Sequence, residues 1–332
     1  MRIGLIGTGR IGTLHAEILA GLSGVQSVTV TDLDSKRAEA FATTYGHGLA
    51  SNVDDLLGLV DAVIITAATS AHAELIGRSV KAGLPVFCEK PIALDLESTQ
   101  LIVSQVEESG AVVQMGFQRR FDPGYTRAQE MVASGALGTL YVVRMAGHDP
   151  EPPHEEYIPV SGGLFRDFSV HDFDALRFVT GQEVVEVYAD GSVIAFPVFE
   201  KYGDIDTGVL TLRLESGALG ILSVTRHDPL GYDIRMELFG SRDSVVVGWD
   251  DRMPLRSLEP GMPAPPGPAY TRFQDRFLLA YQRELAAFLD VARGERANPC
   301  TPQDALEALA IAVAADLSRA EHRPVRVEEV KS

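Results

Sequence analysis

The chain has 332 residues, enough for two domains that each bury a core, and 45% of its residues are hydrophobic. Its formal net charge of −17 repels phosphate backbones and anionic lipids, so neither nucleic-acid nor membrane partners are expected. No apolar run is long enough to span a bilayer, and a strand begins at the first residues rather than a signal peptide, so we expect a cytoplasmic protein. The two cysteines, Cys88 and Cys300, suggest neither a disulfide framework nor a metal site.

The first thirty-two residues have the pattern strand, glycine turn, helix and strand. An apolar strand at 3–6 leads into Gly7-Thr8-Gly9-Arg10-Ile11-Gly12, a G-x-G-x-x-G sequence that predicts a dinucleotide-binding turn. Gly7 allows the tight turn, Gly9 lets the backbone approach a pyrophosphate, and Gly12 lets the helix lie close to the strand. The second strand, 28–31, ends at Asp32, where a carboxylate meets the ribose hydroxyls of NAD. Arg37, further on, leaves room for some use of NADP.

Strand and helix patterns continue to alternate after Asp32, which predicts a parallel sheet covered by helices. Helices are expected at 35–45, near 53–57, at 71–82, and from an N-cap at Asp95 to about 109. Strands are expected at 62–67, 85–88 and 112–116. We assign residues 1–119 to an NAD-binding Rossmann domain, a doubly wound α/β fold.

The second half has long strands of period two, expected at 140–145, 184–188, 208–214, 220–225, 234–239 and 244–247. Residues 215–217 form a hairpin turn, and helices are expected on one side of the sheet, at 172–180, 275–293 and 302–320. Residues 120–332 are therefore predicted to be an α+β domain with a mainly antiparallel open sheet, for substrate binding and oligomerisation. An open face is usually covered by another subunit, so we expect a dimer or tetramer. The proline-rich stretch 254–268 is expected to be a surface loop, an arm or a lid.

Two clusters are candidates for chemistry. Lys90, in Glu89-Lys90-Pro91, follows a parallel strand, where side chains face the ligand edge of the sheet. Asp167 and His171 stand four residues apart, so in a helix they share one face, and the carboxylate can orient the imidazole as a general base.

A metal site is the competing interpretation of the second cluster. It would use His171 with Asp172 and Asp174, or His154 with Glu155 and Glu156. Neither combination has a recognised ligand spacing, so no metal is predicted.

Together these motifs resemble those of the glucose-fructose oxidoreductase, inositol dehydrogenase and MocA family. The resemblance rests on residues 7–12, 66–72, 89–91 and Asp167-x-x-x-His171, and it covers nearly the whole chain. Within that family the segments most similar to inositol 2-dehydrogenases are 116–125, 161–167 and 231–234. Gln118 and Phe121 depart from the methionine and tyrosine that such enzymes often carry, so the substrate pocket is expected to differ at these two positions.

The resemblance implies NAD-dependent oxidation of a secondary hydroxyl of a cyclitol, with myo-inositol converted to 2-keto-myo-inositol. It implies that His171 is the base, that Asp167 fixes its tautomer, and that Lys90 hydrogen-bonds the reacting oxygen; which of Lys90 and His171 first accepts the proton stays open. Arg120 and Tyr232 are further substrate-binding candidates. The cofactor site that it implies comprises Gly7, Thr8, Gly9, Arg10, Ile11, Gly12, Asp32, Arg37, Ala67, Thr69, His72, Glu89, Lys90 and Gln118.

Two alternatives are kept. A non-catalytic NAD-sensing regulator would keep the Rossmann domain and lose the catalytic groups, whereas Lys90, Asp167 and His171 are all present. A dehydrogenase of another polyol, a pyranose or a sugar phosphate would keep the chemistry, with Arg119 and Arg120 holding the phosphate.

Overall fold

The computed structural model describes residues 1–265 and 267–331, which form two compact units. Unit 1 comprises Met1–Phe121 and Leu278–Glu307, and unit 2 comprises Asp122–Phe277 and the chain from Ala308 onward. The first change of unit lies within two residues of the expected boundary at 119. The return of 278–307 to unit 1 was not expected.

Unit 1 is built on a six-stranded parallel sheet with the order β3-β2-β1-β4-β5-β6. This is the doubly wound order, in which the direction of winding reverses between β1 and β4 and ligands bind at the carboxyl ends of the strands. The predicted Rossmann fold is therefore confirmed. The strands are β1 (Arg2–Ile6), β2 (Ser27–Thr31), β3 (Gly48–Leu49), β4 (Ala62–Ile65), β5 (Val86–Glu89) and β6 (Val113–Gly116).

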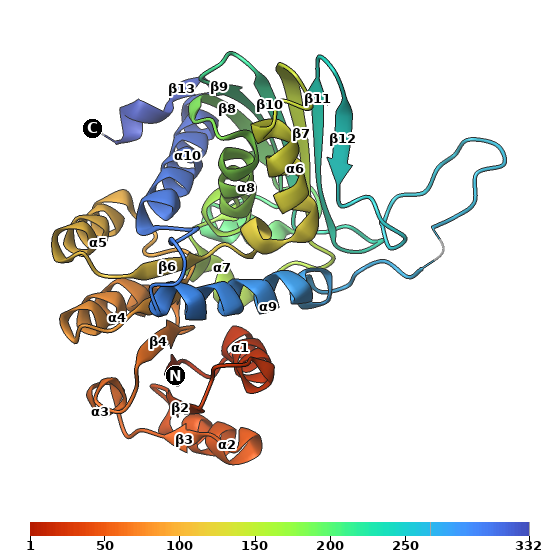
Figure 1. Ribbon diagram of the computed structural model, residues 1–332. Coiled ribbons are helices and arrows are strands. Elements are labelled where there is room, and N and C mark those ends of the chain that lie inside the picture. The colour runs from red at the N-terminus through yellow and green to blue at the C-terminus, as the bar shows by residue number, and fades with distance from the viewer. Residues whose placement is uncertain (266, 332) are drawn as a thin grey trace. The chain divides into compact units, whose positions relative to one another are not determined.

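Helices cover both faces of this sheet, with α3, α4 and α5 on one face and α1, α2 and α9 on the other (Figure 1). Three of them begin at polar N-caps, because Asp34, Asn52 and Asp95 accept hydrogen bonds from backbone N–H groups of the first turn. The cap expected at Asp95 is thus confirmed. The helices are α1 (Arg10–Gly21), α2 (Ser35–Tyr45), α3 (Val53–Leu57), α4 (Thr69–Lys81), α5 (Leu96–Ser109) and α9 (Phe273–Ala292), the last of which enters unit 1 at Leu278.

The returning segment joins unit 1 through the edge strand β6. The Met115 N–H donates to the carbonyl of Cys300 (2.9 Å), and the Asn298 amide donates to the carbonyl of Val113 (2.6 Å). The Gln114 side chain, which is buried, donates to the carbonyl of Glu284 in α9 (3.2 Å). These bonds satisfy polar groups of an edge that would otherwise be open, which explains why 278–307 packs with the first unit.

Unit 2 is built on a seven-stranded sheet with the order β12-β11-β7-β10-β9-β8-β13. β7 and β10 pair in parallel, and the other pairs are antiparallel, so the predicted mainly antiparallel sheet is confirmed. The hairpin expected at 215–217 joins β9 to β10. The strands are β7 (Leu140–His148), β8 (Val184–Ser192), β9 (Thr207–Leu214), β10 (Leu219–Thr225), β11 (Asp233–Gly240), β12 (Ser244–Val247) and β13 (Val325–Arg326).

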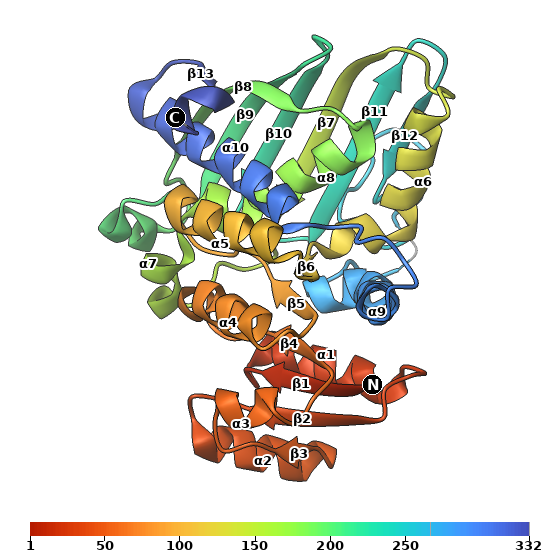
Figure 2. The same cartoon turned by 60° about the vertical axis from the view of Figure 1, so that its left-hand side comes forward.

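The helices of unit 2 lie on one face of its sheet (Figure 2). They are α6 (Pro123–Ala133), α8 (Val170–Thr180) and the part of α10 (Pro302–Glu321) that follows Glu307, with the short α7 (Ile158–Ser161) near the end of the sheet. Helix α6 was not expected, although Asp122 caps it and Pro123 occupies its first position. Short 3₁₀ helices occur at Gln118–Phe121, Glu155–Tyr157, Pro197–Tyr202 and Val327–Val330.

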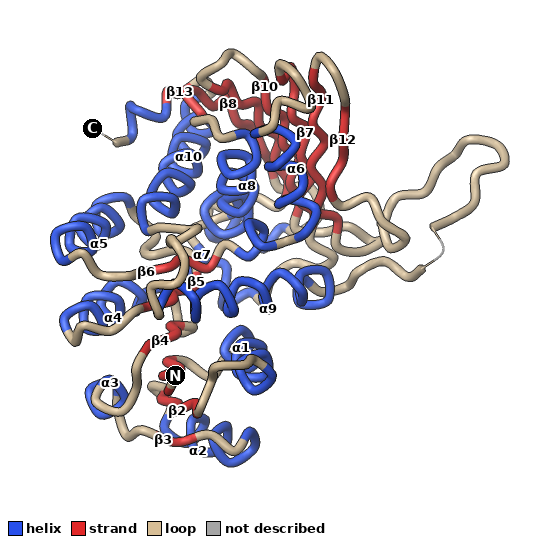
Figure 3. The backbone as a smooth tube through the Cα atoms, viewed as in Figure 1, coloured by secondary structure: helices blue, strands red, loops and turns tan. Residues whose placement is uncertain are grey.

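The chain between β12 and α9 is a long loop that extends from the sheet of unit 2 (Figure 3). It contains the proline-rich stretch expected at 254–268, of which residue 266 lies outside the described residues. No helix in the described part of the chain is long and apolar enough to cross a membrane.

Candidate functional site

The glycine turn after β1 has the geometry that its sequence predicts. Gly7 has φ +101°, and a Cβ there would lie 2.7 Å from the backbone N of Ala67. A Cβ on Gly12 would lie 2.2 Å from the carbonyl oxygen of Gly7, so α1 approaches β1 as closely as glycine permits. A Cβ on Gly9 would meet no atom within 4 Å among the described residues, so the space in front of Gly9 is open.

The N-terminus of α1 follows this turn. Gly9 is its N-cap, and in the described chain no side chain caps the helix and no acidic residue occupies its first turn. The positive end of the helix dipole is therefore left for an anion from outside the protein. An open space at Gly9 and an uncapped helix fit the pyrophosphate of a dinucleotide.

Asp32 lies at the carboxyl end of β2 and closes the same turn. Its Oδ2 accepts from the N–H (2.7 Å) and the hydroxyl (2.8 Å) of Thr8, and its Oδ1 accepts from Nη2 of Arg37 (2.6 Å). Burial disfavours the charge, but Arg37 and the N–H groups of Thr8 and Asp34 outweigh it and lower the pKa of Asp32 to about 2. Asp32 is thus a fixed anion at the position predicted for ribose recognition.

His72 in α4 ties the loop after β4 to the loop after β5. Nδ1 lies 2.7 Å from the carbonyl oxygen of Pro91 and Nε2 lies 2.9 Å from that of Ala67. Burial lowers the pKa of His72, while the two carbonyls act in the opposite direction. His72 and the nearby Thr69, at the first position of α4, were both expected at the cofactor site, and the ring of His72 contacts the loops that flank Lys90.

Glu89 connects the end of β5 to α1. Its Oε1 lies 2.7 Å from Nε2 of His15, a side chain that is fully buried in α1. Lys90 follows directly, half-buried, with a cis peptide bond to Pro91. The contact with His15 fixes the strand end that carries Lys90, and neither the contact nor the cis bond was expected from sequence.

The turn Gln118–Phe121 buries all four of its side chains. Nη2 of Arg120 lies 3.0 Å from Oδ1 of Asp304, and Nη1 donates to the carbonyl of Pro299 (2.9 Å). Burial of Asp304 acts against its charge, but Arg120 and Thr301 outweigh it and lower its pKa. Arg120, expected to bind substrate, therefore also anchors the segment that returns to unit 1, and Arg119 is 2% exposed.

Asp167 and His171 belong to one continuous helical segment of unit 2. Phe165–Ser169 is a π-helical turn, a feature often found at functional sites, and α8 continues from Val170. Oδ1 of Asp167 accepts from the Tyr157 hydroxyl (2.9 Å), and Oδ2 accepts from Nη1 of Arg226 (3.0 Å). Two donors on separate segments thus hold this carboxylate.

Neither Tyr157 nor Arg226 was predicted from the sequence. One signal was available for the second, because Arg226 is a charged residue directly after the apolar strand β10, at its carboxyl end. Tyr157 ends the short 3₁₀ helix Glu155–Tyr157, in a part of the sequence whose apolar residues have no helix or strand periodicity, so no pattern indicated a contact.

The acidic residues of the two alternative metal-ligand combinations lie in different surroundings. Glu155 accepts from Nζ of Lys201 (2.6 Å) and from the hydroxyl of Tyr202 (3.0 Å). Asp172 and Asp174 are 1% and 0% exposed in α8.

Tyr232, the remaining substrate candidate, is buried directly before β11. Its N–H donates to the carbonyl of Tyr270 (2.6 Å), and its ring meets that of Phe277 edge-on at 6.3 Å between centroids. The loop before it lines a surface pocket of about 510 Å³ with His227, Asp228, Pro229, Leu230 and Gly231. Pro150, Glu151 and Thr271 from two other segments complete the lining of this pocket.

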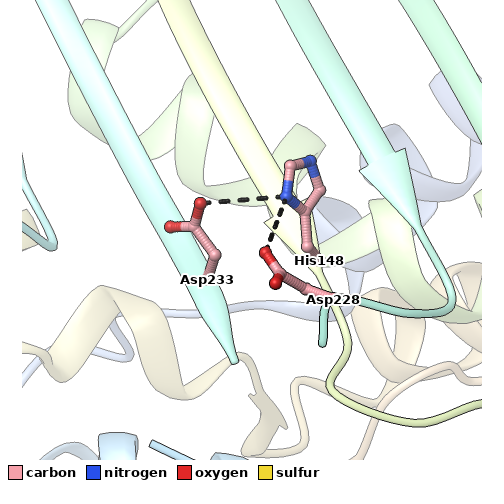
Figure 4. Close-up of side chains that lie close together, drawn as sticks. All are labelled: His148, Asp228 and Asp233. Carbon is pink, nitrogen blue, oxygen red and sulfur yellow. Dashed lines mark ion pairs between the residues drawn. The ribbon is translucent and has the colours of Figure 1, made fainter. Parts of the chain in front are cut away.

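A cluster of His148, Asp228 and Asp233 lies where β7 ends and β11 begins (Figure 4). Nδ1 of His148 is 3.8 Å from a carboxylate oxygen of each aspartate, too far for a hydrogen bond. Arg235 donates to both oxygens of Asp233 at 2.7 and 3.0 Å. Since Asp233 already has a cationic partner, we interpret the cluster as an ion-pair network that joins the ends of two strands.

Two family profiles match the chain. The profile described as the oxidoreductase family with an NAD-binding Rossmann fold matches residues 1–117, and that of the GFO/IDH/MocA C-terminal domain matches residues 125–246. The chain is 38% identical to a myo-inositol dehydrogenase of Streptomyces leeuwenhoekii, over 96% of this chain and 97% of that protein. It is 36% identical to the myo-inositol 2-dehydrogenase of Thermotoga maritima, over 99% of both chains.

Solved structures have the same fold. A myo-inositol dehydrogenase of Corynebacterium glutamicum superposes with a TM-score of 0.90 at 32% identity, over 98% of both chains. The scyllo-inositol dehydrogenase of Lactobacillus casei, solved with NAD(H) and scyllo-inositol, superposes with a TM-score of 0.89 at 27% identity, over 99% of both chains.

Proposed function

The chain belongs to the GFO/IDH/MocA oxidoreductase family, and on this premise we propose that it is a cytoplasmic, NAD-dependent dehydrogenase of a cyclitol. The preferred substrate is myo-inositol, oxidised at one ring hydroxyl to 2-keto-myo-inositol. Two observations support the proposal together. The glycine turn is closed by Asp32, as expected of an NAD site, and relatives named as myo-inositol dehydrogenases align with nearly the full chain. Cys88 and Cys300 are buried and are not joined in a disulfide, which supports a reducing compartment.

The proposal divides the work between the two units. Unit 1 would bind NAD through Gly7, Gly9, Gly12 and Asp32, and bound NAD⁺ would accept the hydride from the carbinol carbon. Unit 2 would supply the base. A neutral His171 takes the hydroxyl proton, Asp167 holds the ring and stabilises the imidazolium, and Lys90 hydrogen-bonds the reacting oxygen.

A neutral polyol suits this chain better than a sugar phosphate does. The net charge of −17 repels an anion at long range, so a phosphate would need a local basic pair. Of the two arginines suggested for that purpose, Arg120 is already paired with Asp304. The contact supports a cyclitol over a sugar phosphate.

Purified protein with NAD⁺ and a panel of substrates tests the proposal, with NADH absorbance as the readout. The panel contains myo-, scyllo- and D-chiro-inositol, glucose, and glucose 6-phosphate. We expect a single strong substrate among the inositols, because buried polar sites reject analogues that lack one matched hydroxyl. Turnover of a hexose or a phosphate alone would refute the cyclitol while keeping the dehydrogenase. No NADH with any substrate would favour an NAD-sensing regulator.

We also propose that the open face of the unit 2 sheet joins copies of this chain. Its exposed apolar side chains are Tyr188, Val209, Leu219, Ile221 and Val246, with Arg144 and Glu237 between the last two. Ile221 in β10 pairs in register with Arg144 of β7. Ile221→Lys would place two cations side by side, so light scattering should show a smaller assembly than for the parent, whereas Thr43→Lys in α2 should not change it. A monomeric parent would contradict this proposal.

A further inference from the structure

Arg226 is a buried arginine of unit 2 to which neither the family profiles nor the proposed function gives a role. It follows β10 directly, and its N–H donates to the carbonyl of Asp206 (2.8 Å). The residue is 2% exposed, and its guanidinium lies 6.0 Å from the ring of Phe168. Arginines are rarely buried this deeply unless the charge is used by neighbouring groups.

The neighbours of Arg226 are carboxylates from three segments. Nη1 lies 3.0 Å from Oδ2 of Asp167 and 3.8 Å from Oδ2 of Asp149, and Asp204 adds a third negative charge nearby. Burial disfavours the charge of Arg226, but the three carboxylates outweigh it and raise the pKa of the guanidinium. The single positive charge of Arg226 therefore interacts favourably with all three carboxylates.

The hydrogen bonds of Arg226 are concentrated on one of these anions. Nε and Nη2 are buried and have no hydrogen-bond acceptor among the described residues, so the one acceptor that the side chain reaches is Asp167. The position of the side chain is thus determined mainly by the carboxylate that the proposed function places beside the base.

We propose that Arg226 is a positioning residue of the reaction, which fixes Asp167 together with Tyr157 and offsets its charge so that His171 stays neutral at neutral pH. His171 lies four residues after Asp167 in the same helical segment. A carboxylate beside an imidazole favours the protonated ring, and a protonated ring cannot accept the substrate proton. The proposed function places Asp167 beside His171, and Arg226 next to Asp167 would reduce the pull of that carboxylate on the ring proton.

The inference rests on the proposed function, and Arg226→Met tests it. Without the cation, Asp149, Asp167 and Asp204 lose the positive charge that they share, so His171 should gain its proton at higher pH. The first readout is the titration of the His171 ring by NMR, with the signal assigned by its loss in His171→Asn; we expect the midpoint to rise by about one pH unit. The second is the pH profile of kcat with NAD⁺ and myo-inositol, whose acid limb should move in the same direction.

Two further variants separate positioning from folding. Arg226→Lys keeps the charge, so it should restore the parental midpoint even though it cannot reproduce the guanidinium geometry. Arg276→Met is the matched control, because it removes another buried arginine of unit 2, one that pairs with Asp122 at 2.9 Å. It should leave the His171 midpoint unchanged. If Arg226→Met does not fold, Arg226→Gln combined with Asp149→Asn removes one charge of each sign and is measured in the same way.

The two ideas fail in different ways. An unchanged His171 midpoint and acid limb in folded Arg226→Met would overturn the role of Arg226, whatever the substrate. A parent that is inactive with every inositol, but whose His171 midpoint rises in Arg226→Met, would refute the proposed function and keep the electrostatic role.

Discussion

The guanidinium of Arg37 donates to both oxygens of the Asp32 carboxylate, with Nη2 2.6 Å from Oδ1 and Nε 3.2 Å from Oδ2. Arg37 is the residue that the sequence suggested for binding the 2′-phosphate of NADP, and this pairing occupies it. Arg37 is held by Asp32, whereas a 2′-phosphate would need it free and would meet the carboxylate.

The first prediction is therefore that kcat/KM is higher with NAD⁺ than with NADP⁺. Asp32→Ser releases Arg37 and removes the negative charge, so the ratio of kcat/KM with NAD⁺ to kcat/KM with NADP⁺ should fall by about tenfold or more. Asp61→Ser is the control, because Asp61 is also paired with an arginine, Arg2, but at the start of β1. A parent that prefers NADP⁺ would contradict the assignment.

The second prediction separates two glycines of the same turn. Gly9→Ala adds a methyl group where no described atom lies within 4 Å, so thermal stability should stay the same while NADH binds about tenfold or more weakly. Gly12→Ala adds one 2.2 Å from a carbonyl oxygen, which should cost about 1–3 kcal/mol of stability. Thermal melts and NADH fluorescence measure the two effects, with Gly21→Ala as control. Equal losses of stability would show that the space at Gly9 is misassigned.

The third prediction concerns the proposed catalytic groups. Lys90→Met and His171→Ala should each lower kcat by about 10² or more while NADH still binds, because these groups act on the proton and the reacting oxygen. Asp167→Asn should also be severe, since an amide can hold the wrong tautomer. His154→Ala serves as the control, because His154 is an exposed histidine of unit 2, the unit that contains His171. Near-parental kcat in Lys90→Met would remove the basis for transferring family roles.

The fourth prediction concerns Asp206, which is 2% exposed and accepts from the N–H groups of Ile194, Ala195 and Phe196. Burial disfavours its charge, but these N–H groups outweigh it and lower its pKa. Because the pKa of Asp206 is lower in the folded than in the unfolded state, its charge stabilises the fold at pH values above the unfolded-state pKa of about 4. That stabilisation is lost as the pH falls below this value.

Asp206→Asn should accordingly lower the free energy of unfolding by about 1–3 kcal/mol at pH 7, and the difference should shrink below about pH 4. Urea unfolding at several pH values measures it. Asp190→Asn, at an exposed aspartate of β8, should change little. If the difference in unfolding free energy between parent and variant did not depend on pH, the charge of Asp206 would not be what stabilises the loop 194–196.

Local patterns were enough to predict most elements, and long-range contacts account for what was missed. The strand, turn and helix around Gly7 are encoded within a few residues, and so are the caps at Asp34 and Asp95. The joining of 278–307 to unit 1 depends on bonds such as Met115 to Cys300, which no local pattern contains.

The same distinction applies to the candidate site. Lys90, Asp167 and His171 were selected by spacing and resemblance, because each lies in a recognisable motif. Tyr157 and Arg226 reach Asp167 from distant segments, so only the fold brings them to that carboxylate. Spacing in the sequence can suggest which side chains act, but not which side chains hold them.

The return of 278–307 to β6 also bears on how the chain folds as it is made. Residues 1–121 emerge first from the ribosome, yet their unit is complete only after Glu307 has been added. At about 5–20 residues per second the wait is on the order of ten seconds. Throughout that time the backbone of β6 lacks the partners that Asn298 and Cys300 later provide, so the nascent chain carries an open strand edge on which other chains can pair.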